Sequence, residues 1–245
     1  MQALTSSPPR SMSSTKTAAL ASIAATLALL VFGASLFLAA GTLRWPGAWW
    51  YVLIMAIGQG VTTVVLLRDS LDLLRERLQR PRRLSGVQRW DLLLSKTMGL
   101  IGPLAINVVA GLDRRFELSP GAGPSDGVVI LAIGAAIGGQ AFVSAAMIAN
   151  RFFSAVVRIQ SDRHHAVVTS GPYRLVRHPG YAGALLFFGV APIVLGSLWA
   201  LVPLAGYVVL VVVRTAKEDR FLRRELAGYE AYCAKTPWRL VPFVW

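Results

Sequence analysis

The residues best suited to chemistry lie in a polar, cationic segment between two strongly apolar regions. Residues 171–183 read Gly-Pro-Tyr-Arg-Leu-Val-Arg-His-Pro-Gly-Tyr-Ala-Gly. Pro179 has no backbone N–H and favours an extended conformation at His178, and the glycines around it favour turns. We therefore expect a constrained loop just outside a membrane, although a simple anchoring loop is the alternative, because Arg and Tyr are common where chains enter lipid. The side chains that this loop would present are Tyr173, Arg177, His178 and Tyr181.

Two further charges, Arg214 and Glu218, directly follow an apolar run. Because they are four residues apart, they share one face of a helix. A surface ion pair between them would contribute less than ~1 kcal/mol. Arg214, however, follows three valines and lies at the edge of the hydrocarbon, where charges are more often partnered for function.

The composition is that of a membrane protein. Of the 245 residues, 55% are hydrophobic and only 15% are charged, against about 25% in soluble domains. The net charge of +13 comes from Lys and Arg clustered between apolar spans, which indicates contact with anionic lipid and not with nucleic acid. The single Cys233 excludes an intrachain disulfide and a multi-cysteine metal site, and three histidines do not predict a metal centre.

The elements that must position these residues are predicted to be helices, making an all-α, polytopic transmembrane protein. Residues 1–17 are rich in Ser, Thr and Pro and are predicted to be disordered. Residues 18–40 form an apolar run of 23 residues, long enough to span a bilayer and longer than the ~7–15-residue core of a signal peptide, which is the alternative. Further spans are expected at residues 48–67, 91–111 and 127–149, giving four spans within residues 18–149.

The polar and small residues within these spans predict specific contacts between helices. Asn107 could line a substrate path, but we favour a hydrogen bond to a neighbouring helix. Small residues in the fourth span should permit close helix packing. They are Gly134, Ala135, Gly138 and Ala145.

Two segments complete the expected architecture. Residues 68–90 contain seven arginines, with leucines at helical spacing, and are predicted to form an amphipathic surface helix, an anchor in preference to a substrate gate. The apolar run 182–213 has 32 residues with internal Pro and Gly, which predicts a helical hairpin that turns near residues 196–198. The distribution of cationic loops places both termini, the 68–90 segment and the region from residue 150 onward in the cytoplasm of a cell-membrane protein.

The C-terminal part of the chain resembles the isoprenylcysteine carboxyl methyltransferase family of integral membrane proteins. The resemblance covers residues 150–245, and the first half matches only as a set of apolar spans. It rests on an ordered series of segments: Asn150-Arg-Phe-Phe-Ser, Val-Val-Arg-Ile-Gln160, His165-Ala-Val-Val, Gly171-Pro-Tyr, Arg177-His-Pro-Gly-Tyr181, Arg214-Thr-Ala-Lys-Glu-Asp219, Tyr229-Glu-Ala-Tyr232 and Arg239-Leu-Val-Pro. The family often has two successive Glu residues where this chain has Glu218-Asp219, a change that we interpret as minor.

The resemblance implies a cytoplasmic C-terminal region that binds S-adenosylmethionine. Glu218 can accept from the cofactor's hydroxyl or amino groups, and Arg177 and His178 can donate to its carboxylate. Aromatic rings can form a wall for adenine and attract the sulfonium. The residues implied to bind the cofactor are Gln160, whose alignment is looser, His165, Ala166, Val167, Val168, Tyr173, Arg177, His178, Pro179, Gly180, Tyr181 and Glu218. Arg214 is implied to contact a substrate carboxylate and so to be the catalytic residue.

The expected function is methyl transfer to a lipophilic substrate that enters from the bilayer. A small acid, thiol, phenol or isoprenoid, or a prenylated protein, would fit, and an anionic nucleophile would need positioning in a dry site more than proton chemistry. Where a proton must leave, His164 or His165 could act as base, although a solvated loop histidine is the simpler interpretation. The alternatives are a sterol-reductase-like enzyme that uses NADPH and a non-enzymatic membrane partner protein.

Overall fold

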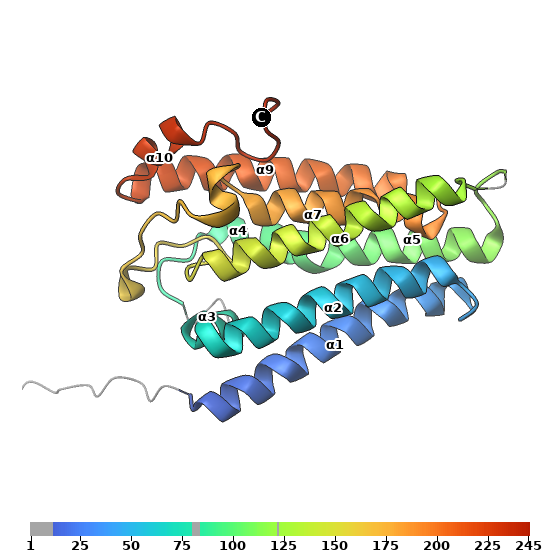
Figure 1. Ribbon diagram of the computed structural model, residues 1–245, viewed down its shortest axis with the longest axis horizontal. Helices are drawn as coiled ribbons and strands as arrows, with labels where there is room; N and C mark the ends of the chain where they lie inside the picture. Colours follow the sequence, from blue (N-terminus) through green and yellow to red (C-terminus); the bar gives the residue numbers. More distant parts are fainter. Residues whose placement is uncertain (1–11, 80–83, 122) are drawn as a thin grey trace, which may run out of the picture.

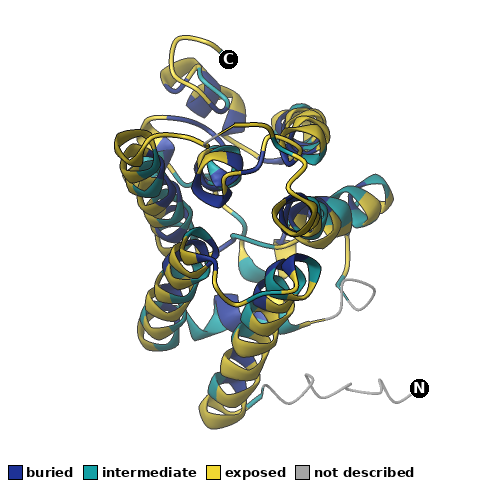
Figure 2. Cartoon of the chain, turned by 90° about the vertical axis from the view of Figure 1, so that its right-hand side faces the viewer, coloured by how far each residue is buried: buried dark blue, intermediate teal, exposed yellow. Residues whose placement is uncertain are grey.

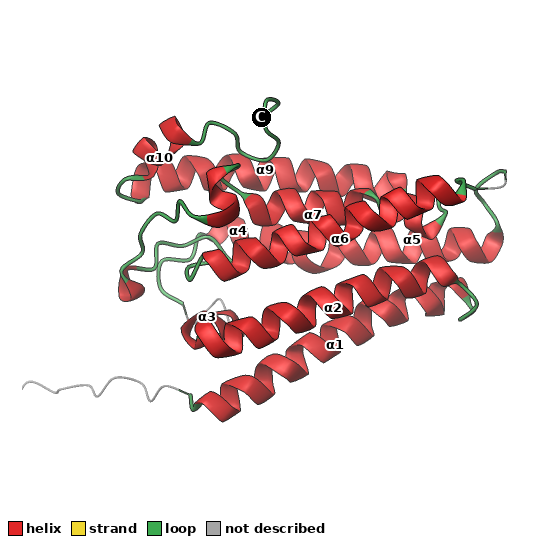
Figure 3. Ribbon diagram, in the orientation of Figure 1, coloured by secondary structure: helices red, strands yellow, loops and turns green. Residues whose placement is uncertain are grey.

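Five long helical segments run roughly parallel or antiparallel to one another. In the computed structural model, which describes residues 12–79, 84–121 and 123–245, the described chain forms helices and loops with no strand (Figures 1 and 3). The long segments are α1 (Ser14–Ala40), α2 (Pro46–Asp69), α4 to α5 (Arg89–Phe116), α6 (Asp126–Ala149) and α9 (Leu201–Glu225). The first four are long and apolar enough to cross a membrane. The expected all-α fold with four spans is confirmed, and the chain is a multi-pass membrane protein.

Local sequence signals explain where these helices begin and bend. α1 begins at Ser14 because the Ser13 side chain accepts a hydrogen bond from the Lys16 N–H, so residues 14–17, expected in the tail, are helical. Residues 1–11 of that tail lie outside the described residues. The third span contains a π-helical turn, Thr97–Ile101, just before Pro103. Proline has no N–H to donate and crowds the preceding turn, so the wider turn accommodates it.

The predicted C-terminal hairpin is present. Helices α7 (Pro179–Gly189) and α8 (Ala191–Leu195) form its first arm, and α9 forms the second. Gly196, in the left-handed conformation with φ of 64°, ends α8 and allows the reversal at the predicted place. α9 continues to Glu225 as one helix, so Arg214 and Glu218 lie on the second arm itself.

The segment expected to lie on the membrane surface packs against the bundle. Helix α3 (Leu71–Leu78) buries Leu73 and Leu74 against Leu66 of α2 and Ala21 of α1. Residues 80–83 of the same segment lie outside the described residues. The leucine spacing therefore marks a face that covers the ends of the first two helices.

Large apolar side chains lie on the outer faces of the helices, and buried residues lie where helices meet (Figure 2). Leu30 of α1 and Leu131 of α6 are 61% and 75% exposed, as a bilayer solvent permits. Asn107 donates to the Phe32 carbonyl and to Ser35 on α1, which confirms the favoured interpretation of a hydrogen bond to a neighbouring helix.

The close contact expected of the fourth span uses a different face of that helix. Gly134 and Gly138 have open space beside them and Ala145 is exposed, whereas Gly139 lies against Gly183 and Phe187 of α7. The expectation was wrong in its residues because composition shows that small residues are present but not which face meets a neighbour. Ala132, Ala136 and Ala146 are the buried alanines of α6.

Substitution of the two neighbouring glycines tests this packing. In Gly139→Ala, the new methyl would lie 2.7 Å from the Phe187 nitrogen and 2.8 Å from the Gly183 oxygen, so the free energy of unfolding should fall by about 1–3 kcal/mol. Gly138→Ala meets no atom within 4 Å and should be neutral or slightly stabilising. Thermal unfolding in detergent measures both, and equal effects would contradict the α6–α7 contact.

Candidate active site

A cavity of about 430 Å³ joins the loop end of the bundle to its apolar interior. One part is lined by residues of the 150–178 loops and by polar side chains of α7 and α9. The other part lies between the spanning helices and is lined by Phe32, Met55, Met98, Pro103, Val143 and Phe188. Such a cavity can hold a polar group and an apolar group end to end.

The structure brings nearly all of the sequence-predicted residues to this one cavity. Pro179 is buried as the first residue of α7 and does not line it, and neither does the exposed His164. Pro179 begins the helix because a proline needs no hydrogen-bond partner at that position, and this directs Tyr181 towards α9. The predicted residues that line the cavity are Gln160, His165, Ala166, Val167, Val168, Tyr173, Arg177, His178, Gly180, Tyr181, Arg214 and Glu218.

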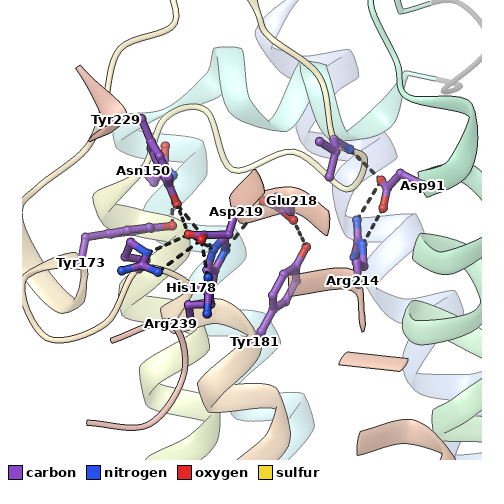
Figure 4. Close-up of polar contacts among 12 residues, drawn as sticks. Asp91, Asn150, Tyr173, His178, Tyr181, Arg214, Glu218, Asp219, Tyr229 and Arg239 are labelled. Atoms are coloured by element: carbon purple, nitrogen blue, oxygen red, sulfur yellow. Dashed lines mark hydrogen bonds and ion pairs between the residues drawn. The ribbon is translucent and has the colours of Figure 1, made fainter. Parts of the chain in front are cut away.

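Glu218 offers the cavity a carboxylate that is only partly engaged. Its Oε2 accepts a hydrogen bond from the Tyr181 hydroxyl (Figure 4). Its Oε1 lies 4.0 Å from Nδ1 of His178, and 21% of the side chain is exposed. A carboxylate held by one donor in a largely dry cavity can accept further hydrogen bonds from a cationic or hydroxyl-bearing ligand.

Arg214 does not pair with Glu218. Its Nε and Nη2 donate to the two oxygens of Asp91, at 2.7 and 3.1 Å, and Nη2 also donates to the Ala155 carbonyl (Figure 4). Asp91 in turn accepts from the Val157 N–H. The surface pair considered from the sequence is therefore wrong: the fully buried carboxylate of Asp91, on another helix, gives Arg214 a two-point contact that Glu218, one turn away, does not.

Asp219 is the centre of a second ion cluster. Its carboxylate accepts from Arg177 at 2.7 and 3.2 Å, from Arg239 at 2.9 Å and from the Tyr229 hydroxyl at 3.1 Å, and it is 1% exposed. His178 Nε2 lies 3.4 Å from the same carboxylate (Figure 4). Asp219 thus does more than preserve the charge of a second glutamate. It joins residues 171–178, the motif loop, to residues 236–245, the C-terminal segment.

Arg177 lines the cavity with its donors already engaged. Besides its contacts to Asp219, its Nη1 donates to the carbonyls of Thr236 and Pro237. The backbone N–H groups of Arg177 and His178 donate to the carbonyls of Trp238 and Arg239. Arg177 therefore holds the loop against the C-terminal segment, an engagement that its sequence context did not reveal.

His165 lies in a loop outside the spanning helices and is kept neutral. Burial, reinforced by the positive charges of Arg158 and Arg163, lowers the pKa of its imidazole to about 4. Its Nδ1 accepts from the Gln160 N–H, and its ring lies 4.6 Å from that of Phe152. The side chain of Gln160 is fixed by its hydrogen bond to the Phe152 carbonyl, so this loop forms a preorganised wall.

Sequence reasoning missed two residues of this site as contributors. Asp91 was treated only as the start of a span, although an acid at the edge of an apolar run signals a buried partner. Asn150 donates to the Tyr173 hydroxyl and accepts from the Phe152 N–H. It follows α6 directly, and a side-chain amide is a common way to satisfy the backbone at a helix end.

Comparison with known proteins finds a match over part of the chain that lines this cavity. Residues 130–224 match the model of the isoprenylcysteine carboxyl methyltransferase (ICMT) family. Over these residues, about two fifths of the chain, the sequence is similar to that family. That region includes α7, the cavity-facing turns of α9 and the loops between α6 and α7.

Curated relatives of ICMT type match shorter or longer parts of the chain. A probable protein-S-isoprenylcysteine O-methyltransferase of Oryza sativa subsp. indica is 43% identical over 61 residues, 25% of this chain and 30% of that protein. Protein-S-isoprenylcysteine O-methyltransferase B of Arabidopsis thaliana is 30% identical over 108 residues, 41% of this chain and 52% of that protein. The chain therefore spans about a third to a half of the length of these relatives.

Removal of the Asp91 charge tests the buried pair with Arg214. Asp91→Asn leaves a buried guanidinium without its counter-charge, which should lower the free energy of unfolding by about 3–5 kcal/mol. Asp72→Asn removes a carboxylate that is 43% exposed and pairs with Arg163, and should cost less than ~1 kcal/mol. The double variant Asp91→Leu with Arg214→Met should recover most of the loss. Similar melting temperatures for both single variants would contradict the assignment.

The pH dependence of stability tests the environment of His165. Unfolded histidine has a pKa of about 6.5, so between that pH and about 4 the unfolded chain binds a proton that the folded chain does not. The stability present above pH ~6.5 should be lost as the pH falls through this window. His165→Asn should reduce that loss, and His164→Asn, at an exposed position of the same loop, should retain it. Identical melting-temperature profiles for the two variants would contradict the buried, neutral imidazole.

Proposed function

We propose that this chain is an integral membrane methyltransferase that transfers a methyl group from S-adenosylmethionine to the carboxylate of a lipophilic substrate of the isoprenylcysteine type. The observation that carries the proposal is the single cavity with a polar end at the loops and an apolar end between the spanning helices. A polar cofactor and a lipid-like acceptor can meet in it. The names of the relatives, protein-S-isoprenylcysteine O-methyltransferases, support the same chemistry.

The polar end has the groups that S-adenosylmethionine requires. Glu218 has acceptor capacity beyond its contact to Tyr181, suited to an ammonium or to ribose hydroxyls. The rings of Tyr173, Tyr181 and His165 line the same space and provide faces for adenine and for a cationic sulfur. These features fit the cofactor without a metal ligand.

Arg214 retains donors for the acceptor's carboxylate. A guanidinium carries five N–H donors, and Asp91 and the Ala155 carbonyl engage Nε and Nη2. Nη1 has only the Met98 sulfur, at 4.0 Å, as a polar neighbour in the described part of the chain. Arg214 can therefore bind a carboxylate oxygen through Nη1 without breaking its pair with Asp91.

The reaction then depends on position more than on proton transfer. S-adenosylmethionine held by Glu218 and the aromatic rings would supply an electrophilic methyl group, and a carboxylate held by Arg214 would accept it, with the thioether of S-adenosylhomocysteine as the leaving group. No proton moves, so no general base is required. The residues around the cavity hold the two reactants in line and exclude water.

The charges at the cavity favour this activity over reduction by NADPH. A cofactor with several phosphates needs free cationic donors. Of the four arginines that line the cavity, Arg158, Arg177 and Arg214 are paired with carboxylates, and Arg77 donates to the Phe153 carbonyl. The single carboxylate of a methyl acceptor needs fewer free cationic donors than the phosphates of NADPH. We therefore place the reductase alternative second.

We also propose that the loop end of the bundle faces the cytoplasm. Lys16, the described arginines of the 68–89 segment (Arg68, Arg75, Arg77 and Arg89) and the arginines after residue 150 lie at this end, whereas Arg44, Arg114 and Arg115 lie at the other. Cationic loops remain on the cytoplasmic side of cell membranes. The polar end of the cavity then opens where S-adenosylmethionine is available.

Ligand binding to the purified protein tests the proposal. Isothermal titration should show S-adenosylhomocysteine binding at micromolar affinity and no NADPH binding. Glu218→Gln should weaken S-adenosylhomocysteine by about 10–150-fold, since a hydrogen bond to a charged group contributes about 1.5–3 kcal/mol. Glu230→Gln, which removes an exposed carboxylate, should bind like the wild type.

A second variant separates the cofactor role from the substrate role. Arg214→Lys keeps the positive charge opposite Asp91 but loses the planar fork. The Arg214→Lys variant should bind S-adenosylhomocysteine with an affinity within about twofold of the wild type. Its rate of methyl transfer to an isoprenylcysteine analogue should fall at least tenfold. Tight NADPH binding, or an Arg214→Lys enzyme with full turnover, would contradict the proposed function.

A further inference from the structure

A second cavity lies next to the candidate active site, along a neighbouring face of α9. This cationic groove, about 640 Å³ in volume, is bounded by the start of α4, by residues 159–161 and by the last turns of α9. Gln160 faces the active-site cavity, while its neighbours Ile159 and Ser161 line the groove. The two cavities therefore share a wall.

The charge in the groove comes from one stripe of α9. Lys217, Arg220 and Arg224 recur at intervals of three and four residues, so they lie on one helical face, whereas Arg214, Glu218 and Leu222 line the other cavity. The three cations make no ion pair within the described residues. Glu225 also lines the groove, so three cations face one carboxylate there.

Aromatic side chains give the groove a second wall. The Lys217 ammonium lies 5.4 Å from the centroid of the Trp90 ring, and Phe221 also lines the space. Tryptophan is enriched where protein meets lipid headgroups, because one side of its ring is apolar and one end can reach water. This wall suits a ligand whose charged group is attached to an apolar body.

The depth of the stripe identifies the ligand class. Lys217 follows Val213, the last residue of the apolar run, by four positions, or ~6 Å along a helix, and Arg220 follows it by ~10 Å. The polar layer of a bilayer extends ~5–8 Å beyond the hydrocarbon on each side, so Lys217 lies within it, and Arg220 and Arg224 lie at and beyond its outer edge. Arginine forks bind phosphate oxygens in two-point contacts.

We propose that the cationic groove binds the headgroup of an anionic phospholipid. The phosphate and any further anionic group lie among Lys217, Arg220 and Arg224, and the lipid's glycerol end lies beside Trp90. Because α9 and residues 159–161 also wall the active-site cavity, a bound lipid would stabilise that wall. The binding itself does not depend on the proposed enzymatic activity.

Lipid retention by the intact protein tests the proposal. Native mass spectrometry of the delipidated full chain, titrated with phosphatidylglycerol or phosphatidylcholine, should show at least tenfold tighter binding of the anionic lipid. The triple variant Lys217→Gln, Arg220→Gln, Arg224→Gln should lose that preference, since each cation near the membrane surface contributes about fivefold. A charge-preserving variant, Lys217→Arg with Arg220→Lys and Arg224→Lys, should keep most of it.

Two further arms decide the outcome. The triple variant Arg44→Gln, Arg114→Gln, Arg115→Gln removes three exposed cations at the other end of the bundle and should retain the preference. If it loses the preference as strongly as the groove variant, general charge and not the groove is responsible, and the proposal is overturned. Displacement of the lipid by equimolar inorganic phosphate would likewise overturn it, since the groove would then be a site for soluble anions.

Discussion

The buried carboxylate of Asp219 is the contact on which the loop end of this protein depends. A carboxylate with 1% exposure is stable only when charged donors replace its water. Arg177 comes from the motif loop, Tyr229 from α10 (Tyr229–Lys235) and Arg239 from the C-terminal segment. One side chain on α9 thus joins three segments, and residues of the motif loop and of α10 line one side of the cavity.

A second buried pair does the same on the other side. Asp91 and Arg214 join the start of the third span to the hairpin, and Asp91 also holds the backbone at Val157. Both pairs lie where apolar helices give way to polar loops, a depth at which an unpaired charge is costly. Each pair engages a cation, while Nη1 of Arg214 and the carboxylate of Glu218 can still bind a ligand in the cavity.

α9 organises the two candidate binding sites by presenting different faces. Arg214 and Glu218 face the cavity that we assign to methyl transfer, and Lys217, Arg220 and Arg224 face the cationic groove. Helical periodicity separates side chains that adjoin in sequence, so one short segment can serve a dry reaction site and a lipid headgroup. The apolar first half of the same helix keeps both at the membrane boundary.

The sequence by itself determined the spanning helices and which residues we expect at the cavity. The lengths of the apolar runs and the prolines predicted the spans, and Gly196 predicted the turn of the hairpin. Of the residues that the family resemblance implied for the site, all but Pro179 line the cavity. These signals are local: hydrophobic periodicity, the missing N–H of proline and the backbone freedom of glycine act within a few residues. The structure that these signals produce can therefore be predicted from neighbouring positions in the sequence.

Only the tertiary structure decided the partners. Arg214 pairs with Asp91, 123 residues away, and not with Glu218; Arg177 pairs with Asp219, 42 residues away; and Gly139, not Gly138, meets α7. Several pairings of these charges and glycines are equally compatible with helical spacing. The choice among them follows from how the helices rotate and cross, since burial rewards a two-point contact or a close backbone approach only where the packed faces bring both groups together.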